Sequence, residues 1–385
     1  MELKRYRLSE LLTIKNGKDY KHLNEGDIPV FGSGGYMLSV DSYLYDKASI
    51  LLPRKGTLSN IQFYDKGKFW TVDTCFYSII NEKLVVPYYL YRYLRSLDLS
   101  GYDTGASIPS MTQKTYNSIK VDLPSVAVQQ KIASILSAYD SQIENNQKRI
   151  KLLEQMADNL YKEWFVRFRF PGFENAEFEG GVPKGWKLER LEDFGIVLET
   201  GSRPKGGIDS SVEAGVPSLG AEAINGLAEF DYNSLKLVPQ DYYDKMKRGK
   251  SKGNHILVYK DGAYIGKVTI FRNGFPFKEY SINEHVFFLN TKDSDYQNYL
   301  YFTLHQKAFF SLMQNLNRNA AQPGLSQQDM NGIKVFKPTK DVVNTFNHYV
   351  EPIFNEVFSL AKEIRLLTHQ RDLLLPRLMS GKLSI

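Results

Sequence analysis

NSIKVDLPS (residues 117–125) and NGIKVFKPT (residues 331–339) are two versions of one phrase, 214 positions apart. Five of the nine residues are identical. Each copy is followed by a long stretch in which apolar residues recur at alternating spacings of three and four. A period of this length is typical of a duplicated domain rather than of a short structural repeat. The phrase therefore predicts two similar halves, each of which closes on a long helix.

The helical stripe after the first phrase matches the stripe after the second without a gap. Nine of eleven stripe positions are apolar in the first copy and ten of eleven in the second. The positions are Gln129, Ile132, Leu136, Tyr139, Ile143, Asn146, Ile150, Leu153, Ala157, Leu160 and Trp164, and then Val343, Phe346, Val350, Ile353, Val357, Leu360, Ile364, Leu367, Arg371, Leu374 and Leu378. A sustained period of 3.5 residues indicates a coiled-coil seam. On this seam, polar Asn146 either fixes the register or lies near a wet end of the bundle.

Prolines and a glycine mark the expected bounds of the two helices. Pro124 and Pro338 stand just ahead of them, where proline is tolerated. Pro376 and Gly381 mark the end of the second helix. Pro352 falls inside the second stripe and predicts a kink or a new start there.

The duplication extends upstream in weaker form. ILLPRKG (50–56) resembles ILVYKDG (256–262), and GDIPVFG (26–32) resembles AGVPSLG (214–220). The expected fold class is α+β, with two duplicated mixed α/β domains separated by two long helices. The expected boundaries are a first domain over 1–125, a helix over 126–168, a linker and second domain over 169–340, and a helix over 341–385.

Short motifs predict some details inside the second half. Asp261-Gly262 and Asn273-Gly274 are typical of hairpin turns. Ser326 with Asp329 is typical of a helix N-cap and its box partner. FPGFENAEFEGGVPKGW (170–186) is interpreted as the linker.

Composition bounds the class of protein. No apolar run approaches the roughly 18 residues that span a bilayer, and the first ten residues hold no apolar signal region. The lone cysteine, Cys75, fits a reducing cytoplasm, which is the expected location. The net charge is +6, and the segments 126–165 and 341–385 are each neutral. The basic excess therefore lies in the domains, which favours a polyanionic partner.

Local catalytic signatures are missing from the sequence. The GKS at 249–251 has no upstream phosphate-loop glycine, and GASIP at 105–109 is not a G-x-S-x-G nucleophile motif. The six histidines form no zinc-type pair, and Cys75 has no cysteine partner. A binding protein is therefore favoured, with no cofactor and no metal in this chain.

Basic loops supply the candidate nucleic-acid contacts. Flexible cations near glycines suit phosphates, and arginine suits guanine edges. The candidates are Arg54, Lys55, Lys66 and Lys68 in the first domain, and Arg203, Lys205, Lys245, Lys247, Arg248, Lys250 and Lys252 in the second.

Residues 123–168 and the ending LLLPRLMSGKLSI (373–385) resemble the central and distal conserved regions of type I restriction-modification specificity subunits. IPVFGSGGYM and LLPRKGTLSNIQFYDKGKFWTVDTCFYSI resemble their target-recognition domains. The second helix departs most from the family, because it lacks the LEQMA-type phrase. This resemblance implies a non-catalytic subunit in which each recognition domain reads one half of a split sequence in double-stranded DNA.

The same resemblance implies that the helices pack antiparallel, separate the domains and dock two methyltransferase subunits. Those partners would bind S-adenosylmethionine, and separate restriction and translocase subunits would use ATP and Mg²⁺. The expected docking residues, which form a polar outer face with two exposed rings, are Lys148, Arg149, Lys151, Glu154, Trp164 and Phe165. The duplicated halves permit a pseudo-two-fold arrangement within one chain.

Two other classes of function stay open at this stage. The first is a two-headed scaffold that binds protein instead of DNA, which a neutral apolar face on both domains would favour. The second is an enzyme whose site is assembled from distant carboxylates.

Overall fold

The computed structural model describes residues 2–103, 109–208, 213–251, 253–316 and 324–383. The chain divides into two compact units, which we call unit 1 (Met1–Ile143 with Leu366–Ile385) and unit 2 (Glu144–Arg365). Both units mix helices and strands, as the fold class predicted.

Unit 1 opens with a strand and a single helical turn and then builds two small sheets. Its elements are β1 (Lys4–Arg7), α1 (Leu8–Leu11), β2 (Leu12–Asn16), β3 (Glu25–Gly32), β4 (Gly35–Val40), β5 (Ser49–Pro53), β6 (Gln62–Tyr64), β7 (Trp70–Thr71), β8 (Cys75–Ile80), α2 (Pro87–Arg95), α3 (Gln113–Ser118) and β9 (Lys120–Leu123).

After the end of the first long helix, unit 2 has a small hairpin and then repeats the plan of unit 1. Its elements are β10 (Phe178–Glu179), β11 (Val182–Pro183), β12 (Lys187–Arg190), α5 (Leu191–Phe194), β13 (Ile196–Thr200), β14 (Val216–Leu219), β15 (Leu237–Val238), α6 (Gln240–Lys245), β16 (His255–Tyr259), β17 (Val268–Phe271), β18 (Ser281–Ile282), β19 (Val286–Thr291), α7 (Gln297–His305), α8 (Lys307–Leu316), α9 (Gln327–Gly332) and β20 (Lys334–Lys337).

The strand order is the same in the two units. Unit 1 has a four-stranded sheet β2-β8-β5-β6 and a three-stranded sheet β4-β3-β7. Unit 2 has the corresponding sheets β13-β19-β16-β17 and β15-β14-β18. In each smaller sheet one pair is parallel, β3 with β7 and β14 with β18. The duplication therefore covers both sheets of each unit, although the residues between the repeated phrases differ.

The repeated phrase is the segment that closes each unit. Its strand pairs with the opening strand, so that β1 lies antiparallel to β9 and β12 to β20. The backbone N–H of Leu8 donates to the carbonyl of Ile119 at 2.9 Å, and that of Leu191 donates to Ile333 at 2.8 Å. The phrase is thus kept twice because it joins the start of each domain to its end just before the long helix.

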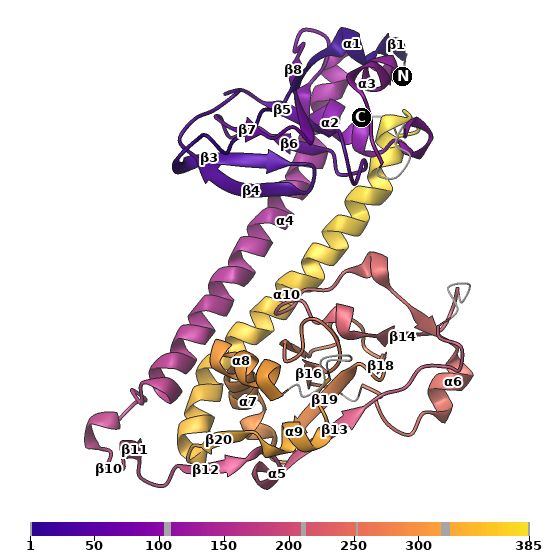
Figure 1. The fold of residues 1–385 in the computed structure, drawn as a ribbon. Coiled ribbons are helices and arrows are strands. Elements are labelled where there is room, and N and C mark those ends of the chain that lie inside the picture. The colour runs from indigo at the N-terminus through magenta and orange to yellow at the C-terminus, as the bar shows by residue number, and fades with distance from the viewer. Residues whose placement is uncertain (1, 104–108, 209–212, 252, 317–323, 384–385) are drawn as a thin grey trace. The chain divides into compact units, whose positions relative to one another are not determined.

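Two long helices follow the closing strands, α4 (Val126–Tyr161) and α10 (Lys340–Met379). Every position of the two predicted stripes is buried or half-buried, so the apolar seam is confirmed. In unit 2, Arg149 of α4 pairs with Glu356, and Phe165, in the short helical segment Lys162–Val166 after α4, packs on Phe346, so the segments there are antiparallel. In unit 1, α2 packs on the first turns of α4 (Figure 1), and Leu136 shares a buried cluster with Leu378.

The course of α10 can be compared with what Pro352, Pro376 and Gly381 predicted for this helix. The helix is continuous through Pro352, so it does not begin again there. Ile353 and Phe354 are buried next to this proline, and their packing compensates for one missing backbone hydrogen bond. Gly381 adopts a left-handed φ of 71°, and the N–H of Ser380 donates to the carbonyl of Pro376 at 3.0 Å. The predicted end of the helix is confirmed.

Local motifs in unit 2 had mixed outcomes. The capping box of Ser326 and Asp329 is present, and Asp261-Gly262 lies in the β16–β17 hairpin. Asn273-Gly274 does not form a hairpin, because the chain leaves the edge strand β17 and next pairs as β18 with β14 in the other sheet. The glycine-rich stretch 170–186 is more than a linker, since Phe170 stacks on Trp186 with centroids 5.8 Å apart and both rings are buried.

Candidate nucleic-acid interface

The loops that follow β5 and β16 take the same path. In unit 1 the N–H of Met111 donates to the carbonyl of Arg54 at 3.1 Å. In unit 2 the N–H of Leu325 donates to the carbonyl of Lys260 at 2.9 Å. The next residue of each loop also forms an equivalent contact. An isolated β-bridge joins Lys55 to Ser110 in unit 1, and another joins Asp261 to Gly324 in unit 2.

A second pair of contacts completes this equivalence. The N–H of Arg54 donates to the carbonyl of Thr74 at 2.9 Å, and the N–H of Lys260 donates to His285 at 3.0 Å. We call this part of each unit the loop end. It comprises residues 53–60, 72–74 and 109–112 in unit 1, and residues 259–266, 283–285 and 324–326 in unit 2.

A close backbone approach fixes both loop ends to the strand beside them. A Cβ added to Gly17 would lie 2.0 Å from the carbonyl oxygen of Val72. A Cβ added to Gly201 would lie 1.6 Å from that of Ile282. Only glycine allows such contact, so the segments after β2 and β13 are held in the same place.

The loop end of unit 1 exposes cations over a polar turn. Arg54 and Lys55 are both exposed, as we expected of DNA-contacting residues. The Asn60 side-chain amide donates to the carbonyl of Ser33 at 2.7 Å, and that of Gln62 donates to Gly32 at 2.9 Å. These bonds hold the β3–β4 turn against the loop that carries the two cations.

The loop end of unit 2 pairs its charges internally. Arg203 Nε contacts Glu284 Oε1 at 2.6 Å, and Lys260 Nζ contacts Asp261 Oδ2 at 3.0 Å. The ring of His285 lies between the two carboxylates, with Nδ1 3.2 Å from Asp261 and Nε2 3.6 Å from Glu284. Cations and carboxylates are therefore nearly balanced here.

Glu222 adds a further carboxylate beside this group. Burial alone would raise its pKa, but the hydrogen bond from Lys236 and the nearby charge of His285 hold the pKa of Glu222 below its ordinary value. The Lys236 Nζ lies 2.9 Å from Glu222 Oε1.

Two of the predicted cations in unit 1 lie in a different turn from Arg54 and Lys55. Lys66 and Lys68 occupy the turn before β7, whereas Asp73 and Thr74 of the loop end follow that strand. Lys68 is exposed, with Nζ 4.8 Å from the ring centre of Tyr43. The four predicted cations of this unit therefore come from two different turns of the chain.

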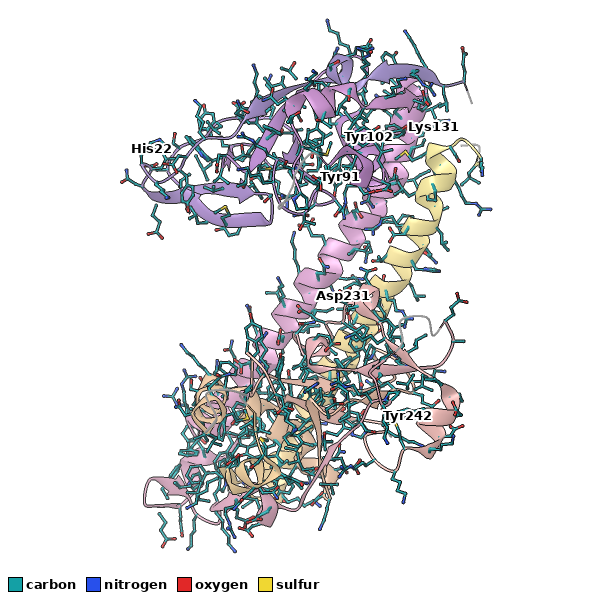
Figure 2. All side chains as sticks on the ribbon, turned by 45° about the vertical axis from the view of Figure 1, so that its right-hand side comes forward. His22, Tyr91, Tyr102, Lys131, Asp231 and Tyr242 are labelled. Carbon is teal, nitrogen blue, oxygen red and sulfur yellow. The ribbon has the colours of Figure 1, made fainter. Side chains whose placement is uncertain are left out.

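Four of the predicted cations of unit 2, Lys245, Lys247, Arg248 and Lys250, lie on α6 or in the segment after it. Tyr242 of α6 is labelled in Figure 2. Its Oη lies 2.9 Å from Ser202 Oγ, which joins the segment of Arg203 and Lys205 to α6. Lys245 pairs with Asp241 at 3.2 Å, and Lys250 Nζ donates to the carbonyl of Asp244 at 3.0 Å.

The remaining cations of this set differ in what surrounds them. Lys247 and Arg248 are exposed, and no described residue forms an ion pair with either. Lys205 is also exposed, and Lys252 lies outside the described residues.

The expected partner-docking residues fall into two groups. Lys148, Arg149 and Lys151 are exposed on α4, and Glu154 is half-buried. Burial raises the pKa of Glu154, an effect that His305 partly offsets.

The expected exposure of Trp164 and Phe165 is wrong. Their exposed fractions are only 5% and 6%. Phe165 packs on Phe346 at 4.9 Å and on Tyr299 at 4.8 Å between ring centres, so these rings belong to the core of unit 2.

Sequence reasoning missed several residues of the loop ends. They are Asp73, Thr74, Lys260, Asp261, Glu284 and His285. The weak repeat of ILLPRKG as ILVYKDG could have identified two of them, because it aligns Arg54-Lys55-Gly56 with Lys260-Asp261-Gly262. The turn before β8 and β19 carries no such signal.

The two halves of the chain, residues 2–155 and 183–342, match the family model of the type I restriction modification DNA specificity domain. The chain belongs to this family. Each match begins ahead of the opening strand of a unit and reaches a long helix, which agrees with the duplicated topology.

The chain is similar to specificity subunits over most of their length. The type I restriction enzyme MjaIX specificity subunit of Methanocaldococcus jannaschii is 26% identical over 354 residues, which cover 89% of this chain and 79% of that protein. The HindI specificity subunit of Haemophilus influenzae is 23% identical over 372 residues, or 79% of each chain. The crystal structure of the S subunit from M. genitalium has the same fold, with a TM-score of 0.63, 16% identity and coverage of 98% and 96%.

Among the described residues, no helix is long and apolar enough to cross a membrane. Within the same residues, no group of three or more His, Cys, Asp or Glu side chains could hold a metal ion.

Proposed function

We propose that this chain is the DNA sequence-specificity subunit of a type I restriction-modification complex in the cytoplasm. Each unit reads one half of a bipartite target in double-stranded DNA. The helices α4 and α10 set the spacer between the halves and dock two methyltransferase subunits. The chain itself is non-catalytic, and S-adenosylmethionine, ATP and Mg²⁺ belong to the methyltransferase and restriction partners.

One observation carries this proposal. Two loop ends with the same backbone contacts carry different side chains, within a chain whose two halves both match a DNA specificity domain. Readers of two different half-sites need a shared scaffold with divergent loops. The internal repeat supplies both.

The charge distribution supports DNA over a protein partner. The exposed cations Arg54, Lys55, Lys247 and Arg248 lie outside the long helices, while residues 126–165 and 341–385 are neutral. Phosphate contacts by Lys and Arg position a reader on the duplex, and base contacts specify the sequence. Binding of a protein partner by a two-headed scaffold does not require the basic residues to be concentrated outside the long helices.

A domain exchange tests the proposal. Residues 1–123, which end before Pro124, are replaced by the equivalent segment of a relative with a known target, and the chimera is expressed with its methyltransferase subunits. Sequencing of methylated bases in the cell then gives the motif. One half-site should change, while the other half and the spacer length stay the same.

Two outcomes would contradict the proposal. If both half-sites changed, the units would not read independently. If the unaltered complex methylated no specific motif and bound duplex DNA without salt dependence, the scaffold hypothesis would be favoured instead.

A further inference from the structure

The two loop ends present different side chains at matched backbone positions. The match follows from the hydrogen bonds of Arg54 and Lys260 and from the strands that follow each turn, β8 and β19. In the order unit 1 to unit 2, the matched positions are Arg54 to Lys260, Lys55 to Asp261, Asp73 to Glu284 and Thr74 to His285.

These substitutions change the chemistry that the loop end offers. The set in unit 1 holds two exposed cations and one carboxylate. The set in unit 2 holds one cation, two carboxylates and a histidine, and Arg203 joins it through Glu284. Unit 1 thus offers mainly hydrogen-bond donors at this place, whereas unit 2 adds carboxylate acceptors.

The carboxylates of unit 2 are oriented by their neighbours. Lys260 Nζ donates to Asp261 at 3.0 Å and to the carbonyl of Glu284 at 3.1 Å, so one ammonium ties the two acidic residues together. Asp261 and Glu284 are 29% and 35% exposed, so both are accessible to a ligand.

Glu284 has a further acceptor that the protein does not use. Its Oε2 atom is closed to solvent, and no donor among the described residues reaches it. An acceptor of this kind is costly to leave unmatched. The other oxygen of the same carboxylate, Oε1, is held by Arg203 at 2.6 Å, so the protein fixes one side of Glu284 and leaves the second acceptor unmatched.

We propose that Asp261 and Glu284 read the exocyclic amino group of a base in the half-site of unit 2. In the major groove such groups are N4 of cytosine and N6 of adenine, and Asp and Glu accept from cytosine. Lys260, Arg203 and His285 position the two carboxylates and offset their charge near the phosphates. Arg54, at the matched position in unit 1, donates to a base edge that carries acceptors, as guanine does.

This inference rests on the proposed function, and a selection experiment separates the two. The full chain, in complex with its methyltransferase subunits, is incubated with a randomised duplex DNA library, and the bound sequences are determined. The unaltered complex should enrich a bipartite motif. If it enriches none, the proposed function fails, and the assignment of single residues fails with it.

Given a motif, Glu284→Gln and Asp261→Asn are compared with Glu192→Gln. Glu192 pairs with Arg190 at 2.9 Å on α5, beside the opening strand, and is the matched control. Each loop-end variant should lose about tenfold of its discrimination at one base pair of one half-site. The control should leave the motif unchanged.

A variant in unit 1 provides a second test of the inference, which remains informative even if the variants of unit 2 fold poorly. Lys55→Asp places the carboxylate of unit 2 at the matched exposed position of unit 1, and should shift preference in the other half-site alone. Melting curves accompany every variant. An unchanged motif in folded Glu284→Gln and in Lys55→Asp would overturn the inference and leave a purely structural ion-pair cluster.

Discussion

Arg371 of α10 donates a hydrogen bond from Nη1 to Oδ1 of Asp140 on α4 at 2.7 Å. The same carboxylate also accepts from Tyr88 and, at 3.3 Å, from Arg92, whose side chain is only 5% exposed. Arg371 is the one polar residue in the second helical stripe. Its place on the seam is explained by this acceptor, which three elements of unit 1 share.

Replacing Asp140 should therefore destabilise unit 1. Asp140→Ala leaves two guanidinium groups without this carboxylate, and we expect the free energy of unfolding to fall by about 2–3 kcal/mol. Denaturant unfolding followed by circular dichroism measures it. Asp46→Ala, at an exposed position of the same unit, should change it by less than about 0.5 kcal/mol. Equal effects of the two variants would contradict the shared role of Asp140.

Two glycines should be essential at matched places in the units. Gly17→Ala and Gly201→Ala each force a Cβ to within about 2 Å of a backbone carbonyl, and backbone cannot move aside cheaply. Each variant should lose at least about 2 kcal/mol of stability, in its own unit. Limited proteolysis with mass spectrometry locates the loosened unit.

Gly34→Ala is the matched control for these glycines. A Cβ at Gly34 meets nothing within 4 Å, and this residue does not have a left-handed φ. The stability of the Gly34→Ala variant should stay the same or rise slightly, because alanine lowers the conformational entropy of the unfolded chain. A control as damaging as Gly17→Ala would show that the close approach is not the cause.

The long helices and the duplicated plan could be predicted because their signals are local. An apolar stripe such as the one through Ile132 and Leu136 is predicted from the spacing of apolar residues along the chain. The ends of its helix are predicted from a nearby proline or glycine. A new helix start at Pro352 was a wrong expectation for the same reason, since a local rule does not include the burial of Phe354 beside it. The exposure of Trp164 and Phe165 also failed, because their partner Phe346 lies on the other half of the chain.

The loop ends could be predicted only in part. Arg54 and Lys55 stand in a repeated phrase, so spacing and charge identified them. The ion pair of Arg203 with Glu284 joins residues 81 positions apart, and no periodicity links them. Such contacts follow from the strand order of the sheet, which the sequence did not specify.

The burial of Trp164 and Phe165 leads to a test of partner docking. Phe165→Ala should destabilise unit 2 by about 3–5 kcal/mol, as loss of a buried aromatic ring does. Val166→Ala, at a position that is 56% exposed, is the neighbouring control and should be nearly neutral. If Phe165→Ala removed methyltransferase binding while melting stayed unchanged, the ring would act at the docking surface after all.

The exposed cations of α4 should behave in the opposite way. Lys151→Glu reverses a charge on the outer face and should weaken co-purification with the methyltransferase subunits, with melting of the chain unchanged. Lys307→Glu on α8 is a charge-matched control outside the long helices. Equal loss of partner from both variants would point to a general charge effect.

Cys75 should report on the opening of unit 1. Burial raises the pKa of its thiol to about 12, so almost no thiolate forms at pH 8. An alkylating reagent should leave Cys75 unmodified in the folded chain and modify it after unfolding, as mass spectrometry can show. An added exposed thiol, Ser59→Cys, should react at once.

The raised pKa of the Cys75 thiol also determines how this group changes the stability of the fold with pH. The unfolded thiol ionises near pH 8.5, roughly, while the folded thiol stays protonated. Its contribution to stability is therefore present below that pH and is lost as the pH rises toward 12. Cys75→Ser removes this titration, and an unchanged alkaline loss of stability in that variant would assign the effect to other groups.

Lys247 and Arg248 should contribute affinity without specificity. Both are exposed and unpaired among the described residues, which suits contact with phosphates. Replacing both by alanine should weaken binding to all duplex sequences and flatten the salt slope by up to about two units, because fewer counterions are released. Lys307→Ala with Lys334→Ala removes the same charge from α8 and β20, away from α6, and should leave the slope nearly unchanged. Binding is measured by fluorescence anisotropy across a salt series, with specific and random duplexes in parallel. A slope unchanged by the first pair, or a changed motif with an unchanged slope, would remove these two residues from the phosphate-contacting set.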